Sequence, residues 1–283
     1  MTTTPGVLYL CATPIGNLED MTYRAVRVLK EVAAIAAEDT RHTRKLLSHF
    51  DIHTPLVSYH EHNKAVRGPE LIDRLLHGED IALVSDAGMP GISDPGLDLT
   101  RQAINAGITV TPVPGANAAL AALVCSGLDT TLFIFVGFLP KARKKRKELI
   151  ASLISQPYTL ILYEAPHRLK ETLAELQAVF GDRQAVAARE LTKKFEEFVR
   201  GTLASLQAHF TANAPRGEFA LLIEGNTTIM AEQPDENNTE LSLQEAVMKL
   251  VATGIQKKDA IRLVASQRGL PRREVYQLML DKQ

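Results

Sequence analysis

Short apolar runs alternate with amphipathic helical patterns along the first 113 residues, and this alternation constrains the fold more than any other feature. Strands that alternate with helices predict an α/β domain with a mainly parallel sheet covered by helices. The expected strands are Val7–Ala12, Ala33–Ala37, Leu56–Ser58, Ile81–Ser85 and Ile108–Val113. The expected helices are Tyr23–Lys30, Thr40–His49, Pro69–His77 and Leu97–Ala106.

A second α/β region follows the segment Pro112-Val113-Pro114-Gly115, which breaks the first pattern. We therefore predict one domain over residues 1–114 and a second over 115–230, the latter with a mixed sheet. Its expected helices are Ala116–Cys125, Lys144–Ile154 and His167–Phe180. Its expected strands are Leu132–Val136, Thr159–Tyr163, Ala185–Ala188, Phe195–Arg200 and Phe219–Ile223.

The C-terminal region has a different composition. Residues 231–240 contain four acids and no base, which predicts a solvated linker. Beyond it, residues 241–283 show apolar residues at helical spacing, with Gly269-Leu270-Pro271 between two helical patterns. This small helical unit resembles a helix-turn-helix and carries a net charge of +4 over residues 256–283. It could contact nucleic acid, or it could pack on the main body or on a second subunit.

Composition excludes several classes of protein. The net charge of −1 provides no global field toward nucleic acid, so any such contact must come from local patches. Cys11 and Cys125 lie in apolar runs and are expected to be buried thiols rather than a disulfide or metal ligands. The histidines show no metal spacing, and no apolar run has membrane-spanning length. We therefore expect a cytoplasmic protein that has no metal and no membrane contact.

The loop Ser85–Gly96 follows a buried strand and precedes a helix, where α/β proteins bind ligands. Its three glycines allow close backbone approach, and Pro90 and Pro95 stiffen it. The loop is acidic and lacks the lysine of a phosphate-binding loop. Carbonyls and carboxylates suit a cationic ligand, and S-adenosylmethionine, with its sulfonium and amino groups, fits. The alternative is an ordered surface loop that only closes a βα unit.

Several blocks in this order resemble the tetrapyrrole-methylase-like (class III) methyltransferases. The N-terminal block Ala12–Asp20, the Ser85–Gly96 loop and Pro112–Ala118 carry the resemblance. Further matching blocks are Glu38–Thr43, Ser58–Asn63, Gly137–Lys141, Tyr163–Arg168, Ala188–Lys193 and Gly217–Phe219. The resemblance implies two α/β domains with a cofactor cleft between them, S-adenosylmethionine as the cofactor, and a homodimer. It is strongest to members that methylate a cytidine 2′-hydroxyl in the decoding centre of 16S ribosomal RNA, on naked RNA or on the small ribosomal subunit.

The resemblance also implies which residues hold the cofactor. These are Pro14, Asp86, Gly88, Met89, Ile92, Ala116, Asn117, Ala118, Tyr163, Leu191 and Ala220. A ribose hydroxyl is a poor nucleophile and needs a base, or a group that stabilises the developing alkoxide. Candidates for this role are Glu38, Asp39, Glu190, Lys193 and Lys194, and a lysine could act as a base or as a cation. The sequence leaves this choice open.

RNA contact is predicted at two basic segments. The segment 141–147 has six bases in seven residues, namely Lys141, Arg143, Lys144, Lys145, Arg146 and Lys147. Arg41, Arg44 and Lys45 form a second basic face on the helix that follows Asp39. Such patches neutralise phosphates, although a charge run can also be a solvated face. Two rival functions remain: a methylase of a tetrapyrrole or another small molecule, and a non-catalytic ribosome assembly factor.

Overall fold

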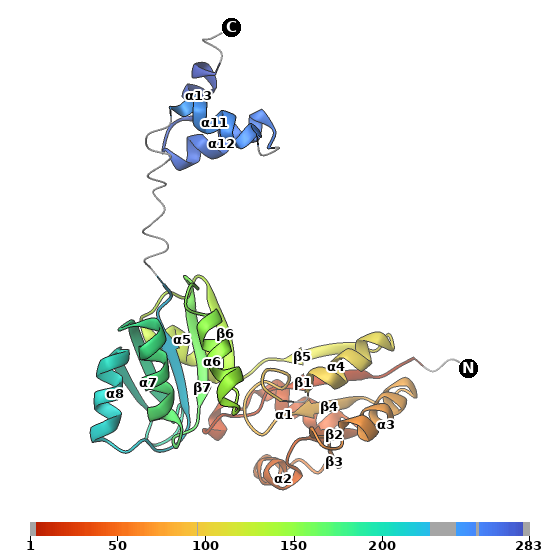
Figure 1. Cartoon of the computed structure of the whole chain (residues 1–283). Coiled ribbons are helices and arrows are strands. Elements are labelled where there is room, and N and C mark those ends of the chain that lie inside the picture. The colour runs from red at the N-terminus through yellow and green to blue at the C-terminus, as the bar shows by residue number, and fades with distance from the viewer. Residues whose placement is uncertain (1–3, 95, 227–241, 253–254, 280–283) are drawn as a thin grey trace. The chain divides into compact units, whose positions relative to one another are not determined.

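The computed structural model describes residues 4–94, 96–226, 242–252 and 255–279. The chain divides after Gly225 into two compact units. The first unit contains two five-stranded sheets, and the second contains helices (Figure 1). None of the helices in the described ranges is both long and apolar enough to cross a membrane.

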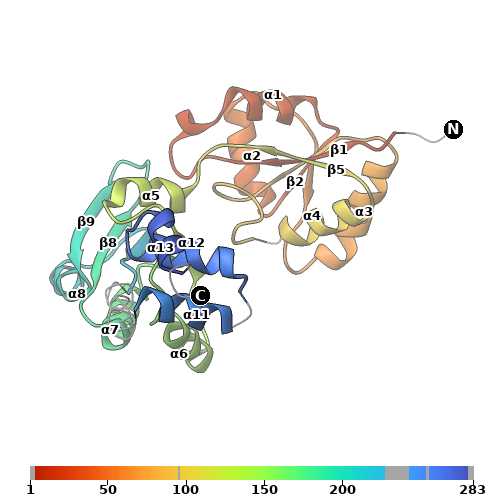
Figure 2. The ribbon, with the colours of Figure 1, turned by 90° about the horizontal axis from the view of Figure 1, so that it is seen from above.

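The first sheet is parallel and has the strand order β3-β2-β4-β1-β5. In β4, consecutive side chains point to opposite faces, and all four are buried, as expected for a parallel sheet covered on both sides. Helices α1 and α2 pack on one face, and α3 and α4 on the other (Figure 2). The strands are β1 (Val7–Cys11), β2 (Ala34–Ala37), β3 (Leu56–Ser58), β4 (Ile81–Val84) and β5 (Thr109–Val113). The helices are η1 (Leu18–Asp20), α1 (Tyr23–Glu31), α2 (Thr40–His49), α3 (Lys64–Leu76) and α4 (Gly96–Asn105).

Helix α3 begins at Lys64, five residues before the predicted start at Pro69. The predicted boundary was wrong because contacts with α4 outweigh the local Gly-Pro signal. Lys64 pairs with Asp98 at the start of α4. At Gly68 the two helices pack closely, because a Cβ atom there would lie 2.8 Å from the side-chain Nε2 atom of Gln102 on α4.

The second sheet is mixed, as predicted. Its strand order is β6-β7-β10-β8-β9, with β6 and β7 parallel and the other pairs antiparallel. Helices α6, α7 and α8 pack on one face, and α5 packs on the other. The strands are β6 (Phe133–Phe138), β7 (Thr159–Glu164), β8 (Gln184–Arg189), β9 (Glu197–Thr202) and β10 (Phe219–Ile223). The helices are α5 (Ala118–Ser126), α6 (Arg143–Ser152), α7 (Leu169–Phe180) and α8 (Leu203–Ala212).

Two features of this sheet were missed from the sequence. Helix α8 was not predicted, although Thr202 and Ser205 form a capping box at its start, a signal that could have revealed it. Strand β9 begins at Glu197, two residues later than predicted, because residues 190–196 form a turn instead. Phe195 therefore lies in this turn and is exposed.

The C-terminal unit has a hydrophobic core of its own. Helices α11 (Leu243–Ala252), α12 (Lys257–Gln267) and α13 (Arg272–Leu278) enclose buried Val247, Val264 and Val275. The predicted acidic linker, 231–240, lies outside the described residues, and the domain boundaries at 114 and 230 stay predictions.

The two cysteines differ in environment. Cys11 is buried in β1, and burial raises the pKa of its thiol to about 12. Cys125 is exposed near the end of α5, so the prediction of a buried thiol was wrong there. Its apolar sequence neighbours indicated burial, but the short helix α5 keeps one face in solvent.

Candidate active site

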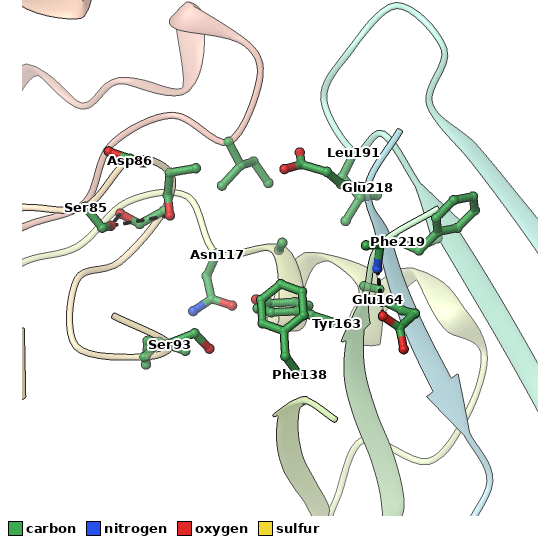
Figure 3. Close-up of a pocket in the computed structure, with 18 of the residues that line it drawn as sticks. Ser85, Asp86, Ser93, Asn117, Phe138, Tyr163, Glu164, Leu191, Glu218 and Phe219 are labelled. Atoms are coloured by element: carbon green, nitrogen blue, oxygen red, sulfur yellow. Dashed lines mark hydrogen bonds between the residues drawn. The ribbon is translucent and has the colours of Figure 1, made fainter. Parts of the chain in front are cut away.

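A cavity of about 540 Å³ lies between the carboxyl edge of the first sheet and the second sheet (Figure 3). Its volume is in the range of small-molecule sites. The loop after β4 and the start of α5 form one side, and the ends of β7 and β8 and the start of β10 form the other. The cavity thus occupies the position at which open α/β sheets bind ligands.

Hydrogen bonds tie the described part of the loop after β4 to itself and to the segment after β1. The backbones of Thr13 and Gly88 exchange two hydrogen bonds, of 2.9 and 3.0 Å. Asp94 accepts hydrogen bonds from the N–H groups of Gly91 and Gly96, each at 2.8 Å. Gly88 has a φ of +80°, which side chains of L-residues rarely allow. This ordering before any ligand binds lowers the entropic cost of binding.

Three carboxylates, those of Glu38, Asp86 and Asp94, line one side of the cavity. Burial and the neighbouring charges, first that of Asp86, raise the pKa of Glu38 above its ordinary value of 4.5. Asp86 also accepts a hydrogen bond from the backbone N–H of Asp39, which ties this loop to the end of β2. The arrangement favours a ligand with positive charge, as the loop composition predicted.

The opposite wall is apolar and aromatic. Tyr163 packs edge-on against Phe135, with ring centroids 5.2 Å apart, and its hydroxyl accepts a hydrogen bond from the N–H of Ala119. Burial raises the pKa of Tyr163, so the phenol stays neutral. Leu191 and Ala220 complete this wall, which suits a flat heterocycle.

A lysine and two glutamates form an ion cluster at the cavity wall. The Nζ atom of Lys193 lies 2.9 Å from Oε1 of Glu190 and 2.7 Å from Oε2 of Glu218. Burial acts to raise the pKa of Glu190. Hydrogen bonds from Lys193 and from the N–H of Glu218 outweigh burial and lower this pKa. Burial acts to lower the pKa of Lys193, but its hydrogen bonds to the carboxylates of Glu218 and Glu190 outweigh burial and raise this pKa. Lys193 is therefore an ammonium and Glu190 a carboxylate at neutral pH.

The turn that carries this cluster has an unusual backbone. Glu190 and Thr192 have φ angles of +48° and +67°, although neither is glycine. Such left-handed residues cost about 1–3 kcal/mol each and concentrate at functional sites. This backbone conformation brings Glu190, Leu191 and Lys193 together on the cavity wall.

Comparison with known proteins agrees with this geometry. The family model for tetrapyrrole (corrin/porphyrin) methylases matches residues 7–207. The chain belongs to the tetrapyrrole methylase family. It is 53% identical to "Ribosomal RNA small subunit methyltransferase I" of Halalkalibacterium halodurans, over 96% of this chain and 94% of the relative. It is 52% identical to the Synechocystis protein of the same name, over 98% of both chains.

Among solved structures, the fold matches uroporphyrin-III-C-methyltransferase from Thermus thermophilus with a TM-score of 0.56. The sequence identity is 21%, and the match covers 80% of this chain and 98% of that protein. This likeness confirms the predicted tetrapyrrole methylase fold.

Most residues predicted from the family motifs lie on the cavity wall. They are Asp86, Gly88, Met89, Ile92, Asn117, Ala118, Tyr163, Leu191 and Ala220, together with Glu38, Glu190 and Lys193. Pro14, Ala116 and Asp39 do not line the cavity. The Asp39 carboxylate instead caps α2 and accepts hydrogen bonds from the N–H groups of Arg41 and His42. Sequence reasoning missed Ile15, Ser93, Asp94, Phe138, Glu164 and Glu218, although all of these fall within or beside the matched motifs.

The basic residues divide into exposed and buried ones. Lys141, Arg143, Lys144, Lys145 and Lys147 are exposed, as are Arg41, Arg44 and Lys45 on α2. Arg146 is buried, and its guanidinium makes hydrogen bonds of 2.7 and 2.8 Å to Glu175 and of 2.5 Å to Glu171. The prediction that Arg146 contacts RNA is therefore corrected, because its charge is neutralised between α6 and α7.

Arg146→Met should destabilise the protein by roughly 3 kcal/mol, because it leaves the Glu175 carboxylate without its partner. The free energy of unfolding from urea titration measures this change. Lys145→Met, at the next and exposed position, is the matched control and should change stability by less than about 0.5 kcal/mol. Equal effects at the two positions would contradict a structural role for Arg146.

Proposed function

We propose that this protein transfers the methyl group of S-adenosylmethionine to the 2′-hydroxyl of a cytidine in the decoding centre of 16S ribosomal RNA. The proposal rests on the nearly full-length identity of 53% to a protein named as a ribosomal RNA small subunit methyltransferase. The electrostatics of the cavity support the cofactor, and the exposed basic residues support the RNA. The small-molecule alternative rests on a structural likeness at 21% sequence identity, and such a likeness shows only that the fold is shared.

The residues present fit S-adenosylmethionine. Glu38, Asp86 and Asp94 offer negative charge to the sulfonium and amino groups, and the wall around Tyr163 and Leu191 offers apolar surface to the adenine. When bound, the cofactor supplies an electrophilic methyl group on a good leaving group. The protein holds this group in place and excludes water from it, and the ordered loop around Gly88 serves that purpose.

We propose two catalytic roles for the ion cluster, a choice that the sequence left open. Lys193 is protonated between two carboxylates, so it acts as a cation that stabilises negative charge developing on the ribose oxygen. Glu190 is the acceptor for the hydroxyl proton. Its pKa is low, but the proton becomes strongly acidic as the oxygen forms its new bond, so a weakly basic carboxylate suffices.

Cofactor affinity should fall as the pH is lowered toward the pKa of Glu38. This pKa is raised above 4.5, and protonation below it removes a negative charge that faces the sulfonium. Affinity should be constant well above this pKa and decline through it, and Glu38→Gln should remove the decline. The charge is worth about 1 kcal/mol, or about fivefold in Kd. Calorimetry on both proteins measures this, and the titration of the ligand's own amino group cancels in the comparison.

The exposed lysines of α6 are proposed to contact RNA phosphates. Changing Lys144, Lys145 and Lys147 to serine should weaken RNA binding and flatten its dependence on salt by about 0.7 in slope for each lost contact. Cofactor affinity should stay within about twofold, since none of the three lines the cavity. Binding measured by fluorescence anisotropy at several salt concentrations tests this, and an unchanged slope would contradict it.

We also propose a cytoplasmic homodimer. Ribosomal RNA as the substrate supports the location. Leu120 and Val124 of α5 support the dimer, because they are four residues apart on one helix face and are 47% and 72% exposed. Light scattering on the purified protein measures the oligomeric state, and a monomer at micromolar concentration would contradict the dimer.

The decisive experiment is nucleoside mass mapping of 16S ribosomal RNA from cells with and without this protein. A methylated cytidine that is lost on deletion and restored by the wild-type gene supports the proposal. Unchanged RNA together with methylation of an added tetrapyrrole would favour the small-molecule alternative. Absence of S-adenosylmethionine binding in calorimetry would favour the assembly factor.

A further inference from the structure

One aromatic ring at the cavity stands largely in solvent. Phe138 ends β6 and lines the cavity, yet it is 57% exposed. Its ring lies beside that of Tyr163, with centroids 5.5 Å apart (Figure 3). Tyr163 is fixed by its hydrogen bond to Ala119, so Phe138 rests on a rigid support. An apolar ring held at the mouth of a site is a candidate for ligand contact.

A β-bulge turns Phe138 toward the cavity. Phe135 pairs with Ile161 and Gly137 with Leu162, so β6 has one extra residue, Val136, between these pairs. Because side chains alternate along a strand, this insertion shifts everything after it to the other face. Phe138 therefore pairs with Tyr163 on the cavity side.

If β6 paired regularly with β7, without the bulge, Phe138 would stand opposite Glu164 instead of Tyr163. The Glu164 side chain bonds Thr172 of α7, so it lies on the covered face of the sheet. The β6 residues on that face, Ile134 and Val136, pack against the hydrophobic core of the second sheet. The bulge thus places on the cavity side a ring that a regular strand would direct toward this core.

Phe138 also leads directly into the basic segment. Lys141 follows three residues later, and the exposed Lys144 and Lys145 lie in the first turn of α6. An aromatic platform next to a row of cations is the arrangement with which proteins bind single-stranded nucleic acid, bases on rings and phosphates on lysines. In the binding mode proposed above, the adenine lies against the wall around Tyr163 and Leu191, which leaves the exposed Phe138 ring for another ligand.

We propose that the Phe138 ring stacks on a nucleobase of the RNA substrate and so holds the reacting ribose at the cavity mouth. This inference rests on the proposed RNA methyltransferase function. Proteins that recognise single-stranded RNA stack its splayed bases on aromatic rings, and the Phe138 ring would hold a base of the substrate in this way.

Tryptophan fluorescence tests the contact directly. The chain contains no tryptophan, so Phe138→Trp creates a single reporter whose emission a stacked base quenches. We expect quenching when small ribosomal subunits from cells lacking the protein are added, and none when S-adenosylhomocysteine is added. Phe133→Trp is the matched control, since Phe133 is 40% exposed at the opposite end of β6 and should not respond to either.

Kinetics provide the second measurement. Phe138→Ala should raise the KM for small subunits about 5- to 100-fold, with the Kd of S-adenosylmethionine within about twofold. Phe138→Tyr, which keeps the ring, should restore most of the substrate affinity. Melting temperatures verify that each variant is folded.

Two results would overturn the inference. A weakened cofactor Kd in Phe138→Ala, with quenching of Phe138→Trp by S-adenosylhomocysteine, would place the ring on the adenine. Unchanged KM without quenching would mean that the ring binds nothing. If instead wild-type protein methylates no ribosomal RNA, the proposed function fails, and the fluorescence titration still reports whether RNA stacks on the ring.

Discussion

Replacing Gly88 with valine is expected to abolish S-adenosylmethionine binding, with a loss of affinity of at least about 100-fold. The φ of +80° at Gly88 excludes a branched side chain without strain of about 1–3 kcal/mol. A Cβ atom there would lie 3.3 Å from Cγ2 of Ile15, and the added methyl groups would extend from it at the cavity wall. The hydrogen bonds that join Gly88 to Thr13 would be displaced at the same time. Calorimetry with S-adenosylmethionine and S-adenosylhomocysteine measures the loss.

Gly107→Val is the matched control for backbone strain. Gly107 has a similar φ of +74°, but a Cβ atom there meets nothing within 4 Å, and the residue does not line the cavity. This variant should lose stability comparably and keep its cofactor affinity. Micromolar binding by a folded Gly88→Val protein would refute the role given to the loop.

Lys193→Met should reduce kcat for methyl transfer by about 100- to 1000-fold, the usual cost of removing one group that stabilises transition-state charge. Cofactor affinity should not fall, because the variant removes a positive charge from the cavity wall and leaves the carboxylates of Glu190 and Glu218 there. Single-turnover methylation of small subunits at saturating cofactor isolates this step from binding.

Lys194→Met tests whether any lysine of this turn would have the same effect. Lys194 is adjacent in sequence but does not line the cavity, and its ammonium lies over the Phe195 ring, 5.7 Å from the centroid. Its kcat should stay within about twofold of wild type. If the Lys193 variant keeps normal kcat, orientation of the substrate alone accounts for catalysis.

The first sheet was predictable because burial on both faces leaves a clear trace in sequence. Ile81-Ala82-Leu83-Val84 is apolar throughout, and its flanking helices have long polar faces. Helix α8 was not predictable in the same way. The segment Leu203–Ala212 is weakly amphipathic, and only the capping box at its start indicates a helix. Local sequence patterns therefore predicted a strand that is buried on both faces better than a weakly amphipathic helix.

The candidate site was predictable where position along a strand decides it. Glu190 follows β8 directly, so its place at a strand end could be inferred. The environments of Arg146 and Phe138 could not, because each depends on partners far along the chain. Arg146 needs Glu175 on α7, and Phe138 depends on the register between β6 and β7. Pairing and register are tertiary properties that composition alone does not encode.

The carboxylate side of the cavity has a consequence for selectivity inside a cell. ATP shares its adenosine with S-adenosylmethionine and would fit the same apolar wall. Its triphosphate, however, would have to lie against Glu38, Asp86 and Asp94, with no lysine in that loop to neutralise it. The three carboxylates would repel the triphosphate of ATP, whereas they would attract the sulfonium of S-adenosylmethionine. With the proposed site, the sign of the charge rather than the shape of the nucleoside would keep ATP from competing for the cavity.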